Sequence, residues 1–510
     1  ENNVINTALN QFPDVAPRNP DGTYGFPKIN DTGTYYSNPI FEANMKENRT
    51  NNYQLDYNVY ANIMPLKGLS IRIEYGGNRG WLNNYYFTPE YSYGMIKNES
   101  LSTRRKNLSK YNSFKQYATY DFEPWKSHRF QIMGGHEAQW GNWESLSGSR
   151  KGYISDIIHS LDVGNATTAT NSGDDGTQWS IESYFGRVNY NLLDRYLVTA
   201  TLRTDGSSSF GKNKRWGWFP SAALAWRVSN EDFMKSAKWI DNLKLRLGWG
   251  LVGNQQSASF AYGATMANTS TAWGTGYYPG NFANENLKWE STRAWNVGFD
   301  LNVLNNRIEF IVDAYLKKTD NLLMRAVLPS YVINNDYMGM SSPWVNKGSL
   351  QNKGIEFSLN TVNIMTKDLQ WRTGATLSFN RNKLTRLDLV PVYWGASTNS
   401  NVGQSVVRNA LGHPLGSFWG YIADGVDSET GDMIYRDVNE DGIVSASDRT
   451  YIGDPNPDFI FGLTNTFSYK GFNLSILLQG SVGNDIYNVS RMDSEGMFDG
   501  RNQTTRVLER

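Results

Sequence analysis

The run YQLDYNVYANIM, residues 53–64, places an apolar or aromatic residue at every second position, with mainly polar residues between them. After the turn PLKG at 65–68, the alternation resumes in LSIRIEY, residues 69–75. Successive side chains of a β-strand point to opposite faces of the sheet, so a period of two gives each strand one apolar face. The stretch therefore predicts an antiparallel hairpin with an apolar side and a polar side.

The same unit recurs along the chain. The further predicted hairpins pair residues 112–123 with 128–137, 179–191 with 196–204, 219–228 with 241–250, 290–303 with 307–317, 353–361 with 369–380, and 459–469 with 472–480. Seven such hairpins predict an all-β chain of about fourteen antiparallel strands.

Strand length and loop asymmetry favour a membrane barrel over a soluble sandwich or propeller. Globular strands average about 5–6 residues, whereas a tilted strand that crosses a bilayer needs about 9–11, which most of these segments reach. Short turns alternate with long excursions at 77–111, 138–178, 251–289, 318–352 and 381–458. This alternation is typical of short periplasmic turns and long extracellular loops, and connections of that length are uncommon in a compact soluble domain. We therefore predict an antiparallel transmembrane β-barrel.

A barrel in lipid has an apolar outer face and a polar lumen. The residues expected to face lipid on one strand are Trp295, Val297, Phe299, Leu301 and Val303. Those expected to face the lumen are Asn296, Asp300 and Asn302. Aromatic residues near predicted strand ends are typical of interfacial girdles, and the alternative is ordinary packing in the bases of loops. These aromatic residues are Tyr53, Tyr75, Trp125, Trp249 and Trp289.

Composition excludes several other classes. No segment approaches the ~18 consecutive apolar residues of a membrane-spanning helix. Lys plus Arg and Asp plus Glu number 49 each, which gives no support to nucleic-acid binding. The absence of cysteine excludes disulfides and Cys-ligated zinc, and the four histidines do not have the spacing of a zinc site. No motif of a nucleophile, P-loop or dinucleotide site has a fitting context, so we expect no enzyme.

Several short strings, taken in order, resemble the SusC/RagA family of TonB-dependent outer-membrane transporters. They are RTDGSS at 203–208, WFPS at 218–221, LKLR at 243–246, GNQ at 253–255, NENLKWE at 284–290, TDNLL at 319–323 and NKGIE at 352–356. The resemblance covers most of the chain from about residue 180 onward. The first 180 residues match more loosely.

The resemblance implies a 22-stranded barrel with an N-terminal plug and a TonB-binding segment. We expect residues 1–510 to be a partial barrel domain of about fourteen strands, without the plug, the TonB-binding segment and the closing strands. The implied function is energised uptake of oligosaccharides across the outer membrane of a Gram-negative bacterium. Implied partners are a SusD-like surface lipoprotein, TonB through the N-terminal region, and outer-membrane lipid. The alternatives are a peptide, siderophore or haem receptor, a passive porin, and a soluble carbohydrate-binding or lyase β-protein.

One loop within 381–458 has the spacing of an EF-hand calcium site over residues 437–448. The predicted ligands are the side chains of Asp437, Asn439, Asp441 and Asp448 and the carbonyl of Ile443. Gly442 stands at the sixth position, where the sharp turn requires it. Asp448 replaces the usual glutamate, as in dockerin-like loops, so a shorter arm must reach the Ca²⁺ ion. The alternative is a solvent-exposed turn rich in Asp and Asn.

Aromatic residues also gather in the predicted loops. Aromatic faces can stack on sugar rings, or they can pack within folded loops. The candidates for substrate binding are Trp140, Trp143, Trp273, Tyr277, Tyr278 and Trp394.

Overall fold

The computed structural model describes residues 4–26, 38–93, 96–174, 176, 178–255, 260–329, 340–395, 405–496 and 501–509. The main strands are β1 (Glu47–Leu66), β2 (Leu69–Thr88), β5 (Leu101–Trp125), β6 (His128–Lys151), β8 (Trp179–Leu192), β9 (Tyr196–Ser207), β10 (Trp216–Arg227), β11 (Ile240–Asn254), β14 (Glu290–Val303), β15 (Ile308–Asp320), β18 (Ser349–Met365), β19 (Leu369–Arg386), β26 (Phe459–Tyr469) and β27 (Phe472–Val482). They pair antiparallel in this order to form one continuous sheet, and β7 (Thr170–Asp174) adds to the side of β6. The predicted seven hairpins and fourteen strands are confirmed.

Short elements occupy the connections. The small strands are β3 (Tyr91–Tyr93), β4 (Ile96–Asn98), β12 (Met266–Thr271), β13 (Gly274–Pro279), β16 (Leu323–Arg325), β17 (Trp344–Asn346), β20 (Val392–Trp394), β21 (Arg408–Ala410), β22 (Phe418–Gly420), β23 (Ala423–Val426), β24 (Met433–Tyr435) and β25 (Thr450–Gly453). The helices are α1 (Val4–Leu9), α2 (Pro39–Met45) and α4 (Ser490–Ser494), with 3₁₀ turns at Leu161–Val163, Ala166–Thr168, Val228–Asn230, Asp232–Met234, Ala446–Asp448 and Thr505–Glu509.

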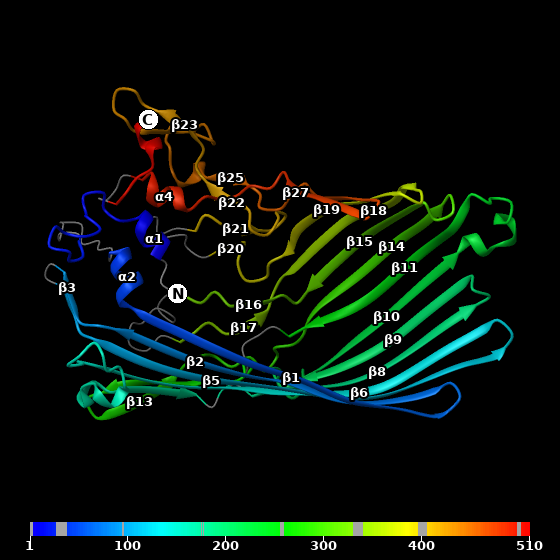
Figure 1. Ribbon diagram of the computed structural model, residues 1–510, viewed down its shortest axis with the longest axis horizontal. Coiled ribbons are helices and arrows are strands. Elements are labelled where there is room, and N and C mark those ends of the chain that lie inside the picture. The colour runs from blue at the N-terminus through cyan, green and yellow to red at the C-terminus, as the bar shows by residue number, and fades with distance from the viewer. Residues whose placement is uncertain are drawn as a thin grey trace.

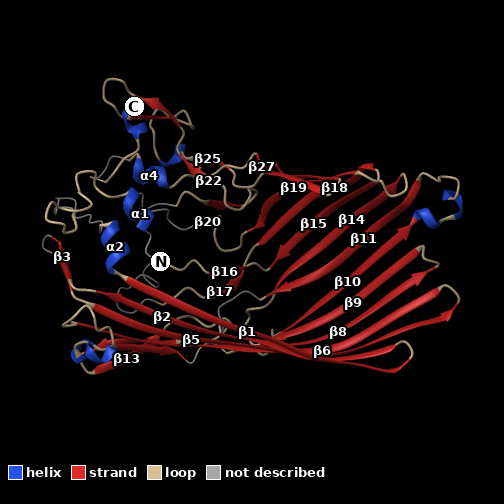
Figure 2. Cartoon of the chain, in the orientation of Figure 1, coloured by secondary structure: helices blue, strands red, loops and turns tan. Residues whose placement is uncertain are grey.

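The sheet is a curved wall whose short turns lie at one end and whose long connections lie at the other (Figure 1). Helical segments stand at these two ends, and the wall between them is made of strands (Figure 2). β1 and β27 form the two edges, and within the described residues they do not pair with each other. In that part of the chain, no helix has the length and apolar character needed to cross a membrane.

The strands are longer than the alternation predicts. Residues 77–111 and 138–178 were expected to be loops, but β2 continues to Thr88, β5 begins at Leu101 and β6 continues to Lys151. The apolar alternation fades along these extensions, where Asn, Ser, Arg and Lys are frequent. Backbone pairing continues without it, because the ladder depends on N–H and C=O groups rather than on apolar side chains. The expected loop boundaries were therefore wrong at these two places.

The two faces of the wall differ as predicted. The register sets Trp249, Trp295 and Leu316 side by side on one face of β11, β14 and β15. On this face Val297 is 58% exposed and Val59 on β1 is 70% exposed, as expected for side chains that meet lipid. Asn296, Asp300 and Asn302 occupy the opposite, polar face, which in a barrel wall is the concave face toward the lumen.

Trp289 packs in a loop base, the alternative to a place in the interfacial girdle. Its ring packs against a buried loop cluster that contains Phe210 and Leu287, both 0% exposed. Its indole N–H donates a hydrogen bond to the carbonyl of Arg215 at 2.9 Å. Since the indole lies among residues of three connections, Trp289 holds the loop bases together instead of lying at the lipid interface.

Candidate functional site

The polar face of the wall has a hollow of about 820 Å³ across β14, β15, β18, β19, β26 and β27. Small residues contribute to its lining, because a glycine or threonine leaves space that a longer side chain would fill; these are Gly374, Gly462, Thr361, Thr373, Ala375, Thr376, Thr464 and Thr466. Longer polar residues also line it, namely Asn302, Asn306, Glu309, Asn360, Arg372 and Gln479. The hollow therefore offers many neutral hydrogen-bond donors and acceptors to a solute on the concave side.

A network of charges crosses three strands of the same face. Arg246 on β11 donates to both carboxylate oxygens of Asp313 on β15, at 2.9 and 3.0 Å, and to Asp300 on β14 at 2.6 Å. Lys244 lies 2.9 Å from Asp300. Arg246, Gly298 and Asp313 are register partners, so the guanidinium passes over a residue that has no side chain. A Cβ at Gly298 would lie 2.5 Å from the guanidinium carbon of Arg246.

A second network stands on the strands β5, β6, β8 and β9. Arg203 donates to Asp205 at 2.7 Å, to the hydroxyl of Ser183 at 2.9 Å and to Glu137 at 3.2 Å. Lys115 approaches Glu137 at 3.3 Å. In both networks cations and carboxylates alternate around the wall, so the charges on the concave side largely balance locally.

The sequence shows the charged residues of these networks, but the apolar–polar alternation does not show which of them pair. Charged residues at lumen positions, such as Lys244, Arg246 and Asp300, are visible in the sequence. Which of them pair depends on the register between strands far apart in the chain. The sequence reasoning therefore missed both networks.

The structure separates the first pair of predicted aromatic ligands. Trp140 pairs with Asn112 and Trp143 with Ser109 on the unbroken β5–β6 ladder, so their side chains point to opposite faces. Trp140 lies on the apolar face and Trp143 on the polar face. Only Trp143 could meet a solute on the concave side.

The other aromatic candidates lie in two different loops. Trp273 is 97% exposed at the tip of the β12–β13 hairpin, and Tyr277 on β13 is also exposed, whereas the adjacent Tyr278 is half-buried. Trp394 on β20 lies 5.7 Å from the guanidinium of Arg449. Among the described residues, no ring contact joins any two of the six candidates. The six candidates are divided among β6, the β12–β13 hairpin and β20.

The first half of the predicted calcium loop folds around its own aspartate and asparagine side chains. Asp437 accepts the backbone N–H of Gly442 at 2.7 Å, and Asn439 accepts that of Asp441 at 3.0 Å. Asp441 accepts the N–H of Ile443 at 2.9 Å. Gly442 has a φ of 85°, the left-handed conformation that the tight turn requires.

Asp448 closes this loop from the other side. Its side chain is 0% exposed, and its carboxylate accepts the backbone N–H groups of Ser445 at 2.7 Å, Val438 at 2.9 Å and Asn439 at 3.3 Å. These bonds, led by that from Ser445, hold the pKa of Asp448 below its ordinary value. No group of three acidic or histidine side chains is gathered for a metal ion within the described residues.

Comparison with known proteins identifies the family. Residues 1–489 match the family described as TonB dependent receptor-like, beta-barrel. The chain belongs to this TonB-dependent receptor β-barrel family. The TonB-dependent receptor barrels are outer-membrane proteins and not enzymes, which assigns the apolar face of the wall to the outer membrane.

Individual TonB-dependent receptors support the assignment. The chain is 33% identical to TonB-dependent receptor SusC of Bacteroides thetaiotaomicron over 493 residues, covering 90% of this chain and 47% of SusC. It is 30% identical to TonB-dependent receptor P3 of Formosa agariphila over 516 residues, covering 96% of this chain and 50% of that receptor. The chain thus spans about half the length of these relatives. The resemblance to the SusC/RagA family is confirmed.

A solved structure supports the same fold. The solved structure of the RagAB peptide transporter superposes with a TM-score of 0.84 at 23% identity, over 96% of this chain and 54% of the other. At this identity the likeness concerns the fold.

Proposed function

We propose that this chain forms part of the barrel wall of a TonB-dependent importer that takes up oligosaccharides together with a SusD-like surface lipoprotein. TonB would act through polypeptide outside residues 1–510. The observation that supports the substrate class is the hollow on the concave face, whose lining is mainly neutral and polar, with threonine, asparagine, glutamine and glycine residues beside the charged residues Glu309 and Arg372. Hydroxyl and amide groups match the hydroxyl groups of a neutral glycan, and the balanced charge networks do not select for a charged solute.

Family similarity supports the same proposal. SusC is the relative with 33% identity, and its match extends over nearly the whole of this chain. Peptide uptake is the second candidate, because the fold superposes on that of the RagAB peptide transporter. The experiment described next also distinguishes two further alternatives, uptake of siderophores or haem and passive diffusion through a porin.

The test uses the full-length protein purified from outer membranes in mild detergent. Proteins that co-purify are identified by mass spectrometry, and calorimetry compares neutral oligosaccharides, peptides and ferric siderophores as ligands. The proposal expects a co-purifying surface lipoprotein and saturable binding of an oligosaccharide. Binding of peptides or siderophores alone would overturn the substrate class, and ligand-independent leakage through the protein in liposomes would indicate a porin.

We also propose that residues 437–448 bind Ca²⁺. The oxygen donors at the first, third, fifth and twelfth positions and the turn at Gly442 support this proposal. An ionised carboxylate has about four lone-pair sites, so each that accepts a backbone N–H can still contact a cation. Bound Ca²⁺ would have a structural role, stabilising the long connection between β19 and β26. The protease experiment described in the Discussion tests this proposal.

A further inference from the structure

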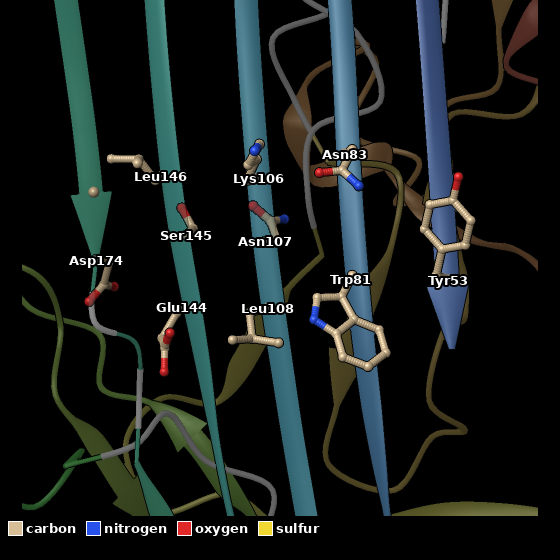
Figure 3. A pocket seen from close by; sticks show the side chains of 11 residues that line it. Tyr53, Trp81, Asn83, Lys106, Asn107, Leu108, Glu144, Ser145, Leu146 and Asp174 are labelled. Atoms are coloured by element: carbon tan, nitrogen blue, oxygen red, sulfur yellow. The ribbon is translucent and has the colours of Figure 1, made fainter. Parts of the chain in front are cut away.

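Two adjoining grooves lie on the apolar-face side of β1, β2, β5 and β6, near the ends that carry the long connections. The first has a volume of about 960 Å³ and is lined by residues that include Tyr53, Trp81, Lys106 and Leu146 (Figure 3). The second, of about 830 Å³, includes Arg49, Arg104 and His159. Asn83 and Lys106 line both, so the two grooves form one continuous surface.

This surface begins where the apolar belt of the wall ends. On β1 the outward row runs from Ile63 through Val59 to Tyr53, a span close to the about 9–11 residues that cross a bilayer. Tyr53 is the register partner of Trp81 on β2, and the two rings end the belt. The next outward residues on β1 are Asn51 and Arg49. The surface therefore lies at the level where lipid headgroups meet the protein.

The surface has an apolar lower part. Tyr53 is 59% exposed, Trp81 41% and Leu146 63%. Aromatic rings at this depth sit at the boundary between acyl chains and headgroups, and Leu146 extends the apolar contact beside them.

The upper part carries cations whose charge is only partly matched. Within the described residues, Lys106 has no carboxylate within ion-pair distance. Arg104 donates to the carbonyl of His159 at 2.9 Å, and its guanidinium lies 3.7 Å from the ring centre of Tyr85. Arg49 is 3.8 Å from Glu47, with its side chain 74% exposed.

Three acidic residues line the surface, and Glu47 lies close to Arg49 and His159, at 3.8 and 3.9 Å. Glu144 already pairs with Lys110 at 2.6 Å and accepts the amide of Asn142 at 2.7 Å. The Asp174 carboxylate accepts a hydrogen bond from the backbone N–H of Gly176 at 2.8 Å. Lys106 and Arg104, in contrast, line the grooves, and neither forms an ion pair with a carboxylate in the described part of the chain. The surface is therefore complementary to an anion placed above an apolar body.

We propose that this surface binds the phosphate-bearing headgroup of a lipid in the outer leaflet. Lys106 would contact a phosphate as a point charge, and Arg49 and Arg104 could donate paired N–H groups. Tyr53, Trp81 and Leu146 would cover the upper part of the acyl chains. The site is on the lipid side of the wall, so it is independent of the solute pathway proposed above.

The test measures binding of bisphosphorylated lipid A to the full-length protein in detergent micelles, by native mass spectrometry. Each basic residue near an anionic lipid surface is expected to contribute about fivefold to the binding affinity. The variant Lys106→Gln should therefore bind lipid A about fivefold more weakly than the native protein, and the double variant Lys106→Gln with Arg49→Gln about 25-fold more weakly. Arg187→Gln removes an exposed cation from the polar face and serves as the matched control, with unchanged lipid binding expected.

Further ligands separate the possible sources of affinity. Dephosphorylated lipid A should bind equally well to the native protein and to Lys106→Gln, because the phosphate that Lys106 contacts is absent. Inorganic phosphate at millimolar concentration should not displace lipid A, because the acyl chains contribute to the affinity of the lipid. Equal loss of lipid binding in Arg187→Gln and Lys106→Gln would overturn the assignment. Equal binding of phosphorylated and dephosphorylated lipid A to the native protein would also overturn it. Thermal unfolding of each variant distinguishes loss of the site from loss of the fold.

Discussion

Arg246 on β11 forms two hydrogen bonds with Asp313 on β15, at 2.9 and 3.0 Å, although β14 lies between them. Gly298 on β14 makes this possible, because it stands in register between the two residues and has no side chain. The same arrangement occurs twice more in the wall. Tyr57 reaches Asn112 across Gly77, and Tyr315 reaches Asn380 across Gly354, each at 3.0 Å.

Gly298→Val should break the Arg246–Asp313 pair. The new Cβ would lie 2.5 Å from the guanidinium carbon, so the arginine must leave and two partly buried charges lose their partner. We expect a destabilisation of about 1–3 kcal/mol, measured by urea unfolding of the full-length protein in micelles. Gly248→Ala is the control, since its Cβ would meet only Asn296 at 3.9 Å. Equal stability of the two variants would show that the crossing contributes nothing.

Gly354→Ala should be more damaging than Gly134→Ala. A Cβ at Gly354 would lie 2.4 Å from the backbone oxygen of Phe379 and 2.5 Å from the Tyr315 hydroxyl, whereas at Gly134 nothing lies within 4 Å. Tyr315→Phe removes only the hydrogen bond and should cost about 0.5–1.5 kcal/mol in unfolding free energy. If Gly354→Ala unfolds at the same denaturant concentration as Gly134→Ala, the close approach is not a constraint.

Chelation should open the loop between β19 and β26. If Ca²⁺ binds residues 437–448, EGTA should increase trypsin cleavage at Arg436 and Arg449, which flank the loop, and added Ca²⁺ should reverse it. Asp441→Asn should make cleavage insensitive to EGTA. Cleavage elsewhere in the same chain is the internal control. An identical digestion pattern with and without chelator would refute Ca²⁺ binding.

The same loop should respond to acid through Asp448. Its pKa is lowered in the folded state by the N–H bonds from Ser445, Asn439 and Val438, so its contribution to stability is complete above the ordinary aspartate pKa of about 3.9. That contribution is lost as the pH falls through the lower folded value. Pepsin cleavage in this loop should therefore rise steeply below about pH 4 in the native protein. Asp448→Asn should be cleaved throughout, and a parallel pH profile for both proteins would contradict this role.

Trp273→Ala tests the loop aromatic residues as glycan ligands. The side chain is 97% exposed, so stability should not change, and lost stacking should weaken oligosaccharide binding about tenfold, or about 1.4 kcal/mol. Trp140→Ala is the matched control, because Trp140 lies on the apolar face. This prediction depends on the proposed glycan substrate. Should both variants bind glycan like the native protein, Trp273 is not a ligand.

The period-two pattern was sufficient for the strands, because each strand meets lipid on one face and water on the other. It failed along the extensions of β2, β5 and β6, where apolar residues such as Trp81 and Leu146 are scattered among polar ones on both faces, so no regular alternation remains although the backbone pairing continues. It also failed for Trp140 and Trp143, which looked like one cluster but differ in parity along β6.

The charge networks and the lipid-facing groove were beyond sequence reasoning for a different reason. Arg246 and Asp313 are 67 positions apart in the chain, and nothing local links them. The string NKGIE served only as a family marker, although the structure gives its glycine a physical role. Gly354 must be small because Tyr315 crosses it.

The crossings over Gly298, Gly77 and Gly354 also bear on how the wall assembles. A slip of β14 by two residues keeps its polar and apolar faces correct, so alternation alone cannot reject it. Such a slip would place Asn296 or Asp300 opposite Arg246 where Gly298 belongs, and close the passage to Asp313. Each crossing thus disfavours register shifts by an even number of residues, which the match of apolar and polar faces tolerates. The crossings therefore help to select the correct register as the strands assemble into the wall.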